Sequence, residues 1–410
     1  MTQSELAELL KKESQEFIRD HLEDNPDLLA LKFSRGSTSL PIRAIAEEIR
    51  CIKKARIKLP ELSARQGLIY EKTALEQASS EFTARFKAEL CRGDKLIDLT
   101  GGLGIDDIFF SERFSEVIYC EQNPLLSEIF RHNIKLLGIN NISVNEGDSI
   151  EALKSFPDNH FDFIYADPAR RDENRRFIGL KNCSPDVVEA MPLLLQKSAR
   201  ILIKASPAIE IEEVKKQFSG LKEFTVVSVD NECREVLLLL GRDTVPEKDI
   251  IVKSVIIDSA SGTRRTFMCV NTLAGERTIS PGVLPWFYEP DGAIIKSRLT
   301  RNIAEEFSLQ FVNSSVDFLT SGELRSNFPG RIFEVKKVLP YKSREIKNYL
   351  REEDITSANV SRRDFPDPPE KIKKLLGLKD GGEDYLFFTK DNSGKPVVIF
   401  CRKHKTKKGE

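Results

Sequence analysis

Apolar residues recur every three or four positions in the first part of the chain, which is the spacing of a helix with one buried face. Ile42 and Ile45 begin one such series, which Pro60 ends. We therefore expect an N-terminal helical region over residues 1–70. A further amphipathic helix is predicted just beyond it, over Glu81–Leu90.

From about residue 94 the pattern changes, because short apolar runs now alternate with helical runs. The predicted strands are Lys95–Leu99, Val117–Cys120, Ile142–Val144, Phe161–Ala166, Ile201–Lys204, Thr225–Val229 and Val236–Leu240. The predicted helices between them are Ser127–Leu137, Ser149–Ser155, Val187–Lys197 and Ile211–Phe218. This alternation predicts a parallel sheet covered on both faces. The last two strands are joined too closely for a crossover helix, so we expect an antiparallel hairpin.

The composition shifts after residue 243, and smaller α+β units are expected from there. The predicted elements of residues 244–330 are strands at Asp249–Asp258 and Thr266–Asn271 and a helix at Leu299–Phe307. Those of residues 331–410 are strands Arg331–Val338, Tyr385–Thr389 and Val397–Cys401 and helices Ser343–Glu352 and Pro369–Leu376. The sequence shows neither an internal repeat nor a low-complexity segment.

Charge and cysteine usage exclude several classes of protein. The 410 residues include 63 Lys and Arg and 64 Asp and Glu, so a nucleic-acid surface would have to be local. The 7 cysteines and 4 histidines are scattered and form no CxxC, so neither a disulfide framework nor a metal site is expected. The charged start lacks the apolar core of a signal peptide, and no apolar run is long enough for a membrane span. A cytoplasmic protein is therefore expected.

A glycine-rich segment, DLTGGLGID, follows the first predicted strand. Glycines here let the backbone turn tightly and approach a ligand, and the start of the next helix offers N–H groups to a carboxylate. A tight turn without a ligand is the alternative reading. The candidate cofactor-binding residues of this segment are Asp98, Thr100, Gly101, Gly102, Gly104 and Asp106.

Acidic residues also follow the next two predicted strands. Glu121, with Gln122 beside it, stands where an acid accepts both ribose hydroxyls of a bound nucleoside. Asp148, followed by Ser149, can accept from an adenine amino group or merely cap the next helix. The alternative for Glu121 is a solvated acid at the end of a strand.

The fourth strand ends in Asp167 and Pro168, where open α/β sheets place their chemistry. Asp167 and the backbone beside Pro168 can accept the hydrogens of an exocyclic amine and help to free its lone pair. Arg170 and Arg171, followed by Arg175 and Arg176, suit contact with phosphates or stacking on bases. A solvated charged loop is the competing interpretation of these arginines.

The order of these motifs over roughly residues 75–242 resembles class I S-adenosylmethionine-dependent methyltransferases. That resemblance implies a Rossmann-like methyltransferase sheet, closed by the antiparallel hairpin, in a domain over residues 71–243. It also implies S-adenosyl-L-methionine as the cofactor. Thr100 stands where a first glycine usually lies, as in RNA guanine-N2 methyltransferases. Many amino-methylating enzymes carry the motif Asp/Asn-Pro-Pro-Tyr/Phe at this strand end. Here Ala169 stands at its third position and Arg170 at its aromatic fourth position, which leaves the acceptor atom open.

The C-terminal half resembles bacterial methyltransferases that carry a ferredoxin-like domain followed by a THUMP-like domain. The matching stretches are Trp286–Pro290, Phe328–Phe333, Ala358–Pro366 and Asp380–Gly382. The resemblance implies a ferredoxin-like domain over 244–330, a THUMP-like domain over 331–410 and an RNA partner, tRNA or rRNA. Two of these stretches have a simpler alternative: Phe328–Gly330 is also consistent with an ordinary turn, and Asp380–Gly382 with a loop before the strand at Tyr385.

The sequence therefore favours a methyltransferase that acts on a base of RNA, with guanine N2 as one acceptor. Asp167 and Pro168 are its predicted catalytic residues, and Arg170 and Arg171 its predicted substrate contacts. Two alternatives remain open: a methyltransferase for protein or a small molecule, and an RNA-binding protein whose methyltransferase core is inactive. A nicotinamide dehydrogenase is disfavoured by the terminal hairpin.

Overall fold

The computed structural model describes residues 1–33, 39–170, 179–181, 183–270 and 277–404. The predicted contacts at Arg171, Arg175 and Arg176 lie outside these residues. The chain divides into two compact units, one of Met1–Lys222 with Leu237–Val245 and one of Glu223–Val236 with Pro246–Glu410. Within the described part of the chain, no helix is both long enough and apolar enough to cross a membrane.

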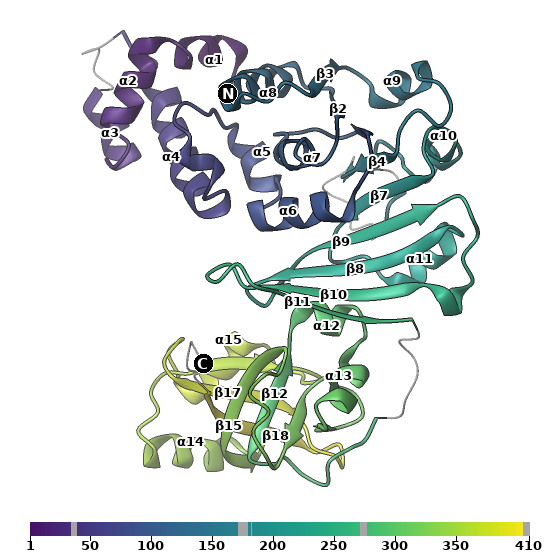
Figure 1. Cartoon of the computed structure of the whole chain (residues 1–410). Coiled ribbons are helices and arrows are strands. Elements are labelled where there is room, and N and C mark those ends of the chain that lie inside the picture. The colour runs from purple at the N-terminus through teal and green to yellow at the C-terminus, as the bar shows by residue number, and fades with distance from the viewer. Residues whose placement is uncertain (34–38, 171–178, 182, 271–276, 405–410) are drawn as a thin grey trace. The chain divides into compact units, whose positions relative to one another are not determined.

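The first unit begins with a group of helices (Figure 1). They are α1 (Gln3–Leu9), α2 (Lys12–Asp20), α3 (Pro26–Phe33), α4 (Ile42–Lys58), α5 (Lys72–Gln77) and α6 (Glu81–Leu90). Helices α1 to α4 share a core in which Leu9, Ile18, Leu29, Ile45 and Ile49 are buried. The helical spacing of the isoleucines is thereby confirmed, because Ile45 and Ile49 are the inward positions of α4.

A parallel sheet follows, with the strand order β3-β2-β1-β4-β7. Its strands are β1 (Lys95–Asp98), β2 (Glu116–Glu121), β3 (Ile142–Glu146), β4 (Phe163–Ala166) and β7 (Arg200–Ala205). The connecting helices are α7 (Ile105–Phe110), α8 (Pro124–Leu137), α9 (Ser149–Ser155), α10 (Met191–Lys197) and α11 (Ile211–Gln217). The order reverses between β1 and β4, and ligands of such sheets bind where the carboxyl ends of the strands diverge.

Two further strands form the predicted hairpin, β8 (Leu221–Val229) and β9 (Glu232–Gly241). Asp230 and Asn231 between them both have positive φ, as the tight turns of hairpins require. The sheet continues past the hairpin through β10 (Ile251–Ile257) and β11 (Arg264–Cys269) to give the order β11-β10-β8-β9-β7-β4-β1-β2-β3. The hairpin is therefore internal to the strand order, because β10 pairs in parallel with β8.

A seven-stranded sheet forms the core of the second unit, with the order β13-β14-β12-β15-β18-β17-β16. Its strands are β12 (Trp286–Pro290), β13 (Gln310–Phe311), β14 (Leu319–Ser321), β15 (Gly330–Pro340), β16 (Asn359–Arg362), β17 (Asp384–Lys390) and β18 (Pro396–Lys403). Its helices are α12 (Gly292–Lys296), α13 (Thr300–Glu306), α14 (Ser343–Glu352) and α15 (Pro369–Leu376).

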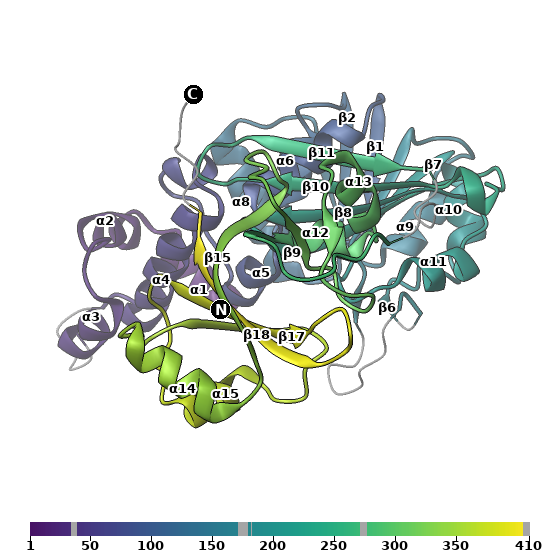
Figure 2. The same cartoon turned by 90° about the horizontal axis from the view of Figure 1, so that it is seen from below.

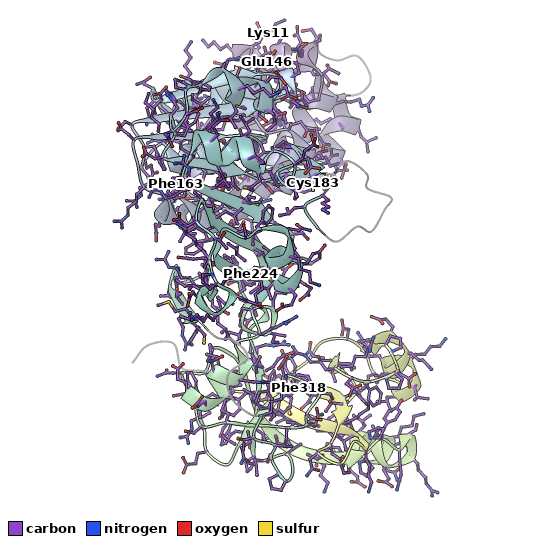
Figure 3. All side chains as sticks on the ribbon, turned by 90° about the vertical axis from the view of Figure 1, so that its right-hand side faces the viewer. Lys11, Glu146, Phe163, Cys183, Phe224 and Phe318 are labelled. Carbon is purple, nitrogen blue, oxygen red and sulfur yellow. The ribbon has the colours of Figure 1, made fainter. Side chains whose placement is uncertain are left out.

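Side chains of β17 and β18 alternate between the two faces of this sheet. On one face, α14 and α15 pack against Leu386, Phe388 and Val398, and Figure 2 shows these two helices together beside β17 and β18. On the other face, Phe387 packs in a cluster with Phe318, which Figure 3 labels. Each face of the strand pair is thus buried by a separate apolar cluster.

The segment predicted as a ferredoxin-like domain, residues 244–330, contributes strands to both sheets. Strands β10 and β11 extend the nine-stranded sheet, whereas β12, β13 and β14 join β15 and β18 in the seven-stranded sheet. The division of the chain into two compact units does not follow the boundaries at residues 70, 243 and 330, which stay predictions. Alternating apolar residues predict that a segment forms a strand, but they do not indicate which sheet the strand joins.

Two neighbouring side chains of α8, Asn133 and His132, bind the segment that follows the N-terminal helices. Asn133 of α8 is buried, and its side-chain amide pairs with the backbone of Ile69 as a neighbouring strand would. Its Oδ1 accepts from the Ile69 N–H at 3.0 Å, and its Nδ2 donates to the Ile69 carbonyl at 2.9 Å. His132 adds a contact from its Nε2 to the carbonyl of Gly67 at 2.9 Å. These bonds fix the chain that leads into α5 and α6.

We expect Asn133→Ala to lower the free energy of unfolding by about 1–3 kcal/mol, because it leaves two buried backbone groups of Ile69 unpaired. Urea denaturation followed by circular dichroism measures the change. Asn140→Ala, at an exposed position beyond the end of the same helix, is the control and should change it by less than about 0.5 kcal/mol. Equal effects of the two substitutions would contradict this account of Asn133.

Candidate functional site

The carboxyl ends of β1, β2, β4 and β7 border an open pocket of about 900 Å³. Ligand pockets typically measure about 300–1,000 Å³, so this one can hold a nucleoside-sized molecule. The predicted site residues that line it are Asp98, Thr100, Gly101, Gly102, Gly104, Asp106, Glu121, Gln122, Ser149 and Asp167. The parallel register Asp98↔Tyr165 brings the first and fourth strand ends together.

The glycine loop lies against two stacked aromatic rings. Tyr119 and Phe130 stack with their centroids 4.1 Å apart, and the Tyr119 hydroxyl donates to the Gly102 carbonyl at 2.6 Å. A Cβ on Gly101 would overlap the Tyr119 ring, and one on Gly104, whose φ is +73°, would overlap the Phe130 ring. Glycine is therefore required at these two positions by the protein's own packing, and the loop is held in a fixed shape.

Glu121 at the end of β2 is held by backbone N–H groups on both of its oxygens. Oε2 accepts from Gly102 at 2.8 Å, and Oε1 accepts from Asn123 at 2.7 Å. A carboxylate has about four lone-pair positions, so each oxygen retains capacity for one more donor. Since Glu121 lines the pocket, it presents a fixed acceptor pair to a ligand there.

Asp148 lies differently from the other strand-end acids. Its Oδ1 caps α9 by accepting from Ile150 at 2.8 Å and Glu151 at 3.0 Å. Of the described residues predicted for the site, Asp148 and Pro168 do not line the pocket. Gln122 lines the pocket and reaches Asp148 Oδ2 with its Nε2 at 3.4 Å. The capping role that the sequence left open for Asp148 is thus observed.

Asp167 directly follows β4, and two side chains hold it. Its backbone N–H donates to Thr100 Oγ1 at 2.7 Å, and its Oδ2 accepts from the Lys204 ammonium at 2.5 Å. Thr100 Oγ1 in turn donates to Asp98 Oδ1 at 2.9 Å. Arg170 belongs to the short strand β5 (Ala169–Arg170), and the rest of the predicted arginine group lies beyond the described residues.

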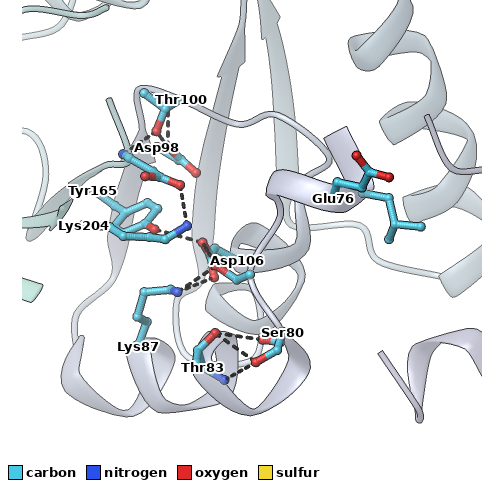
Figure 4. Close-up of polar contacts among 12 residues, drawn as sticks. Glu76, Ser80, Thr83, Lys87, Asp98, Thr100, Asp106, Tyr165 and Lys204 are labelled. Atoms are coloured by element: carbon cyan, nitrogen blue, oxygen red, sulfur yellow. Dashed lines mark hydrogen bonds and ion pairs between the residues drawn. The ribbon is translucent and has the colours of Figure 1, made fainter. Parts of the chain in front are cut away.

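Asp106, at the start of α7, is the centre of a buried polar network (Figure 4). Its Oδ2 accepts from Ser79 and from the Tyr165 hydroxyl, both at 2.9 Å, and Lys87 Nζ lies 3.2 Å from its Oδ1. Burial alone would raise the pKa of Asp106, but the charges of Lys87 and Lys204 outweigh it and hold the pKa below the ordinary value. Asp106 is therefore an ionised carboxylate inside the protein.

Lys87 of α6 is fully buried and also donates to Ser79 at 2.8 Å. Ser79 precedes α6, whose cap is the neighbouring Ser80. A buried ammonium is costly unless it is paired, so this contact ties α6 to the start of α7. As a result, residues 74–79 form one wall of the pocket.

Asp98 and Asp107 form a second buried acid pair beside this network. Burial raises the pKa of Asp98 to about 7, although its bonds from Thr100 oppose the change. Burial also raises the pKa of Asp107 well above its ordinary value, and the nearby charge of Asp98 adds to the effect. Because each negative charge of the pair disfavours the other, the two buried carboxyls do not both ionise near neutral pH, and the pair retains a proton.

This pair should make the protein less stable as the solution becomes more alkaline. The pKa of Asp98 is about 7 when folded against an ordinary 3.8, so between these values the folded chain holds a proton that the unfolded chain has released. The stabilising contribution is complete below about pH 4 and is lost as the pH rises through about 7. Asp107→Asn should therefore gain stability relative to the wild type between about pH 4 and pH 8. Urea denaturation of both proteins across this range measures the free energy of unfolding. If the pH dependence of that free energy were the same in the wild type and in Asp107→Asn, the proton retained by the pair would be contradicted.

Sequence reasoning missed three polar residues of the site: Ser79, Lys87 and Lys204. Lys204 follows the apolar run Ile201–Ile203 near the end of the strand RILIKA, at the same sheet edge as the acids, and that position was a usable signal. Lys87 looks like an ordinary surface lysine in its helix, and its burial follows only from the packing of α6 on α7. Within the described ranges, no group of three or more His, Cys, Asp or Glu residues is arranged to hold a metal.

Comparisons with known proteins agree with this geometry. Residues 330–403 match the family described as THUMP domain-like. A solved structure from Porphyromonas gingivalis W83, provisionally described as a methyltransferase, is 28% identical, covers 98% of both chains and superposes with a TM-score of 0.82. An uncharacterized S-adenosylmethionine-dependent methyltransferase of Mycobacterium tuberculosis is 25% identical over 350 residues, 83% of this chain and 91% of the relative. The predicted α/β fold and the predicted resemblance to methyltransferases with a THUMP-like C-terminal domain are confirmed.

Proposed function

We propose that this chain is an S-adenosylmethionine-dependent methyltransferase that modifies a base of RNA. The observation that carries the proposal is the arrangement of the pocket: the rigid glycine loop and Glu121 stand on one side, and Asp167 stands at the adjacent strand end. The likeness to methyltransferases over most of the chain supports the reaction class. The THUMP domain-like match supports an RNA acceptor, because THUMP domains bind RNA.

The residues of the pocket fit this cofactor chemically. Glu121 offers an oriented carboxylate to the two ribose hydroxyls, and Gly102 beside it leaves the loop backbone open to the ligand. Glu121, which is held by neutral backbone N–H groups, adds negative charge to the pocket, and this charge favours a cationic sulfonium. When bound, the cofactor supplies an electrophilic methyl group on its positive sulfur.

The chain's own residues then position the acceptor. Methyl transfer needs an in-line approach of the nucleophile, so orientation is the larger part of catalysis. Asp167 accepts a hydrogen of the acceptor amine and turns its lone pair toward the methyl group. One S–C bond breaks, one N–C bond forms, and the acceptor nitrogen releases one proton to solvent. Asp167, Arg170 and Arg171 are the proposed contacts of this acceptor.

We expect Glu121→Ala to weaken binding of S-adenosylhomocysteine by a factor of about 10 to 100, because hydrogen bonds to a charged group are lost. The affinity of Glu121→Gln should lie between those of the wild type and Glu121→Ala, since glutamine keeps one acceptor oxygen. Isothermal titration calorimetry measures the dissociation constants. Glu146→Ala is the matched control, because Glu146 ends the neighbouring strand but forms only an exposed ion pair with Arg131. If the wild-type protein did not bind S-adenosylhomocysteine, the proposal that it uses S-adenosylmethionine would be refuted.

We expect the purified protein to transfer a radiolabelled methyl group to RNA from a strain in which its gene is deleted. The RNA and protein fractions of an extract from that strain are separated after the reaction, and labelled nucleosides are identified by mass spectrometry. RNA from the parent strain is the control and should accept less label, since its sites are already methylated. Label confined to protein or small molecules would refute the RNA acceptor, and no label in any fraction would refute the enzyme.

A further inference from the structure

Asp167 is fixed at two independent points, one on its backbone and one on its side chain. The parallel register Ala166↔Ile203 between β4 and β7 makes Asp167 and Lys204 neighbours, one residue beyond the paired positions. Thr100 approaches from the glycine loop, because the Leu99 N–H bonds to the Tyr165 carbonyl at 3.0 Å and so continues the pairing of β1 with β4. Both fixing residues therefore follow from strand register.

Thr100 is the bridge between the two loops of the pocket. Its Oγ1 donates to Asp98 Oδ1 at 2.9 Å and accepts from the Asp167 N–H at 2.7 Å. Its own N–H also bonds to Asp98 Oδ1, at 2.7 Å, which orients the residue. A glycine at this position would lack the hydroxyl and leave the Asp167 N–H without this acceptor. The threonine thus links the cofactor loop to the acceptor loop.

Lys204 holds the other end of Asp167. Its side chain is 13% exposed, and its ammonium lies 2.5 Å from Asp167 Oδ2. A lysine this deeply covered needs a partner charge, and Asp167 supplies it. Pairing Oδ2 with Lys204 selects one orientation of the carboxylate and directs Oδ1 to a separate partner.

We propose that Thr100 and Lys204 are positioning residues that hold Asp167 for the acceptor, Thr100 through the backbone and Lys204 through the carboxylate. The proposal rests on the methyl transfer proposed above. Thr100 acts here through Asp167 rather than as a contact of the cofactor, which separates its role from that of Glu121. The Thr100 hydroxyl then couples the position of the glycine loop to that of Asp167.

The first measurement needs no substrate. Hydrogen–deuterium exchange at the Asp167 amide, resolved by fragmentation mass spectrometry, should become about tenfold or more faster in Thr100→Val than in the wild type, because the acceptor of that N–H is removed. Thr100→Ser keeps the hydroxyl and should restore protection. Unchanged exchange in Thr100→Val would overturn the bridging role, whether or not the chain methylates RNA.

The second measurement separates positioning from cofactor binding. Thr100→Val and Lys204→Met should each lower kcat for labelling of RNA by a factor of about 10 to 100. Their dissociation constants for S-adenosylhomocysteine should stay within about threefold of the wild type. Thr100→Ser and Lys204→Arg should recover part of kcat. Lys154→Met, which removes an exposed ion pair on α9, is the control and should leave kcat unchanged.

A double-mutant cycle tests whether Lys204 acts through Asp167. In an Asp167→Ala background, Lys204→Met should cause little further loss of kcat, because its partner is already absent. Additive losses, or losses of cofactor affinity that match the losses of kcat, would overturn the positioning role. A wild type that labels no RNA would instead refute the proposed function, and the exchange experiment keeps the two failures distinguishable.

Discussion

The pairing of β1 with its two parallel neighbours is the constraint on which the pocket depends. Backbone hydrogen bonds set Asp98 opposite Tyr119 on one side and Tyr165 on the other. Parallel strands end at the same edge of a sheet, so this register gathers polar residues that are far apart in the sequence. A slip by one residue would turn their side chains to the opposite face and disperse the group.

Several buried acids lie close together at this edge of the sheet, and their charges are compensated locally. Asp98, Asp106 and Asp107 are all buried, and two carboxylates this close cannot both ionise at low cost. The protein resolves the conflict by retaining a proton on the Asp98–Asp107 pair while Lys87 neutralises Asp106. Asp167 is paired with Lys204 in the same way, so the net negative charge that remains in the pocket comes mainly from Glu121, which is held by neutral backbone N–H groups.

Much of this edge could be predicted from the sequence, because strand ends and glycine turns leave local signals. The strands from Lys95 to Ala205 lie within two residues of their predicted bounds, whereas β8 and β9 each begin four residues earlier than predicted. The acids at the ends of β1, β2 and β4 line the pocket. Helix α10 begins later than predicted, at Met191, since Pro192 fits only the first turn. Lys87 and Ser79 were not predictable, because their roles arise from the packing of one helix on another. The same limit applies to β10 and β11, because their alternating apolar residues predict strands without indicating which sheet they join.

The burial of Lys87 has a consequence for how this enzyme core can be divided. The parallel sheet starts at Lys95, and a fragment cut there would contain every strand that borders the pocket. It would nevertheless lose the ammonium that balances Asp106 and the wall formed by residues 74–79. An isolated sheet would carry an uncompensated internal charge. A fragment that keeps the whole pocket must therefore begin before α5, and any transplant of the pocket into another scaffold must bring α6 with it.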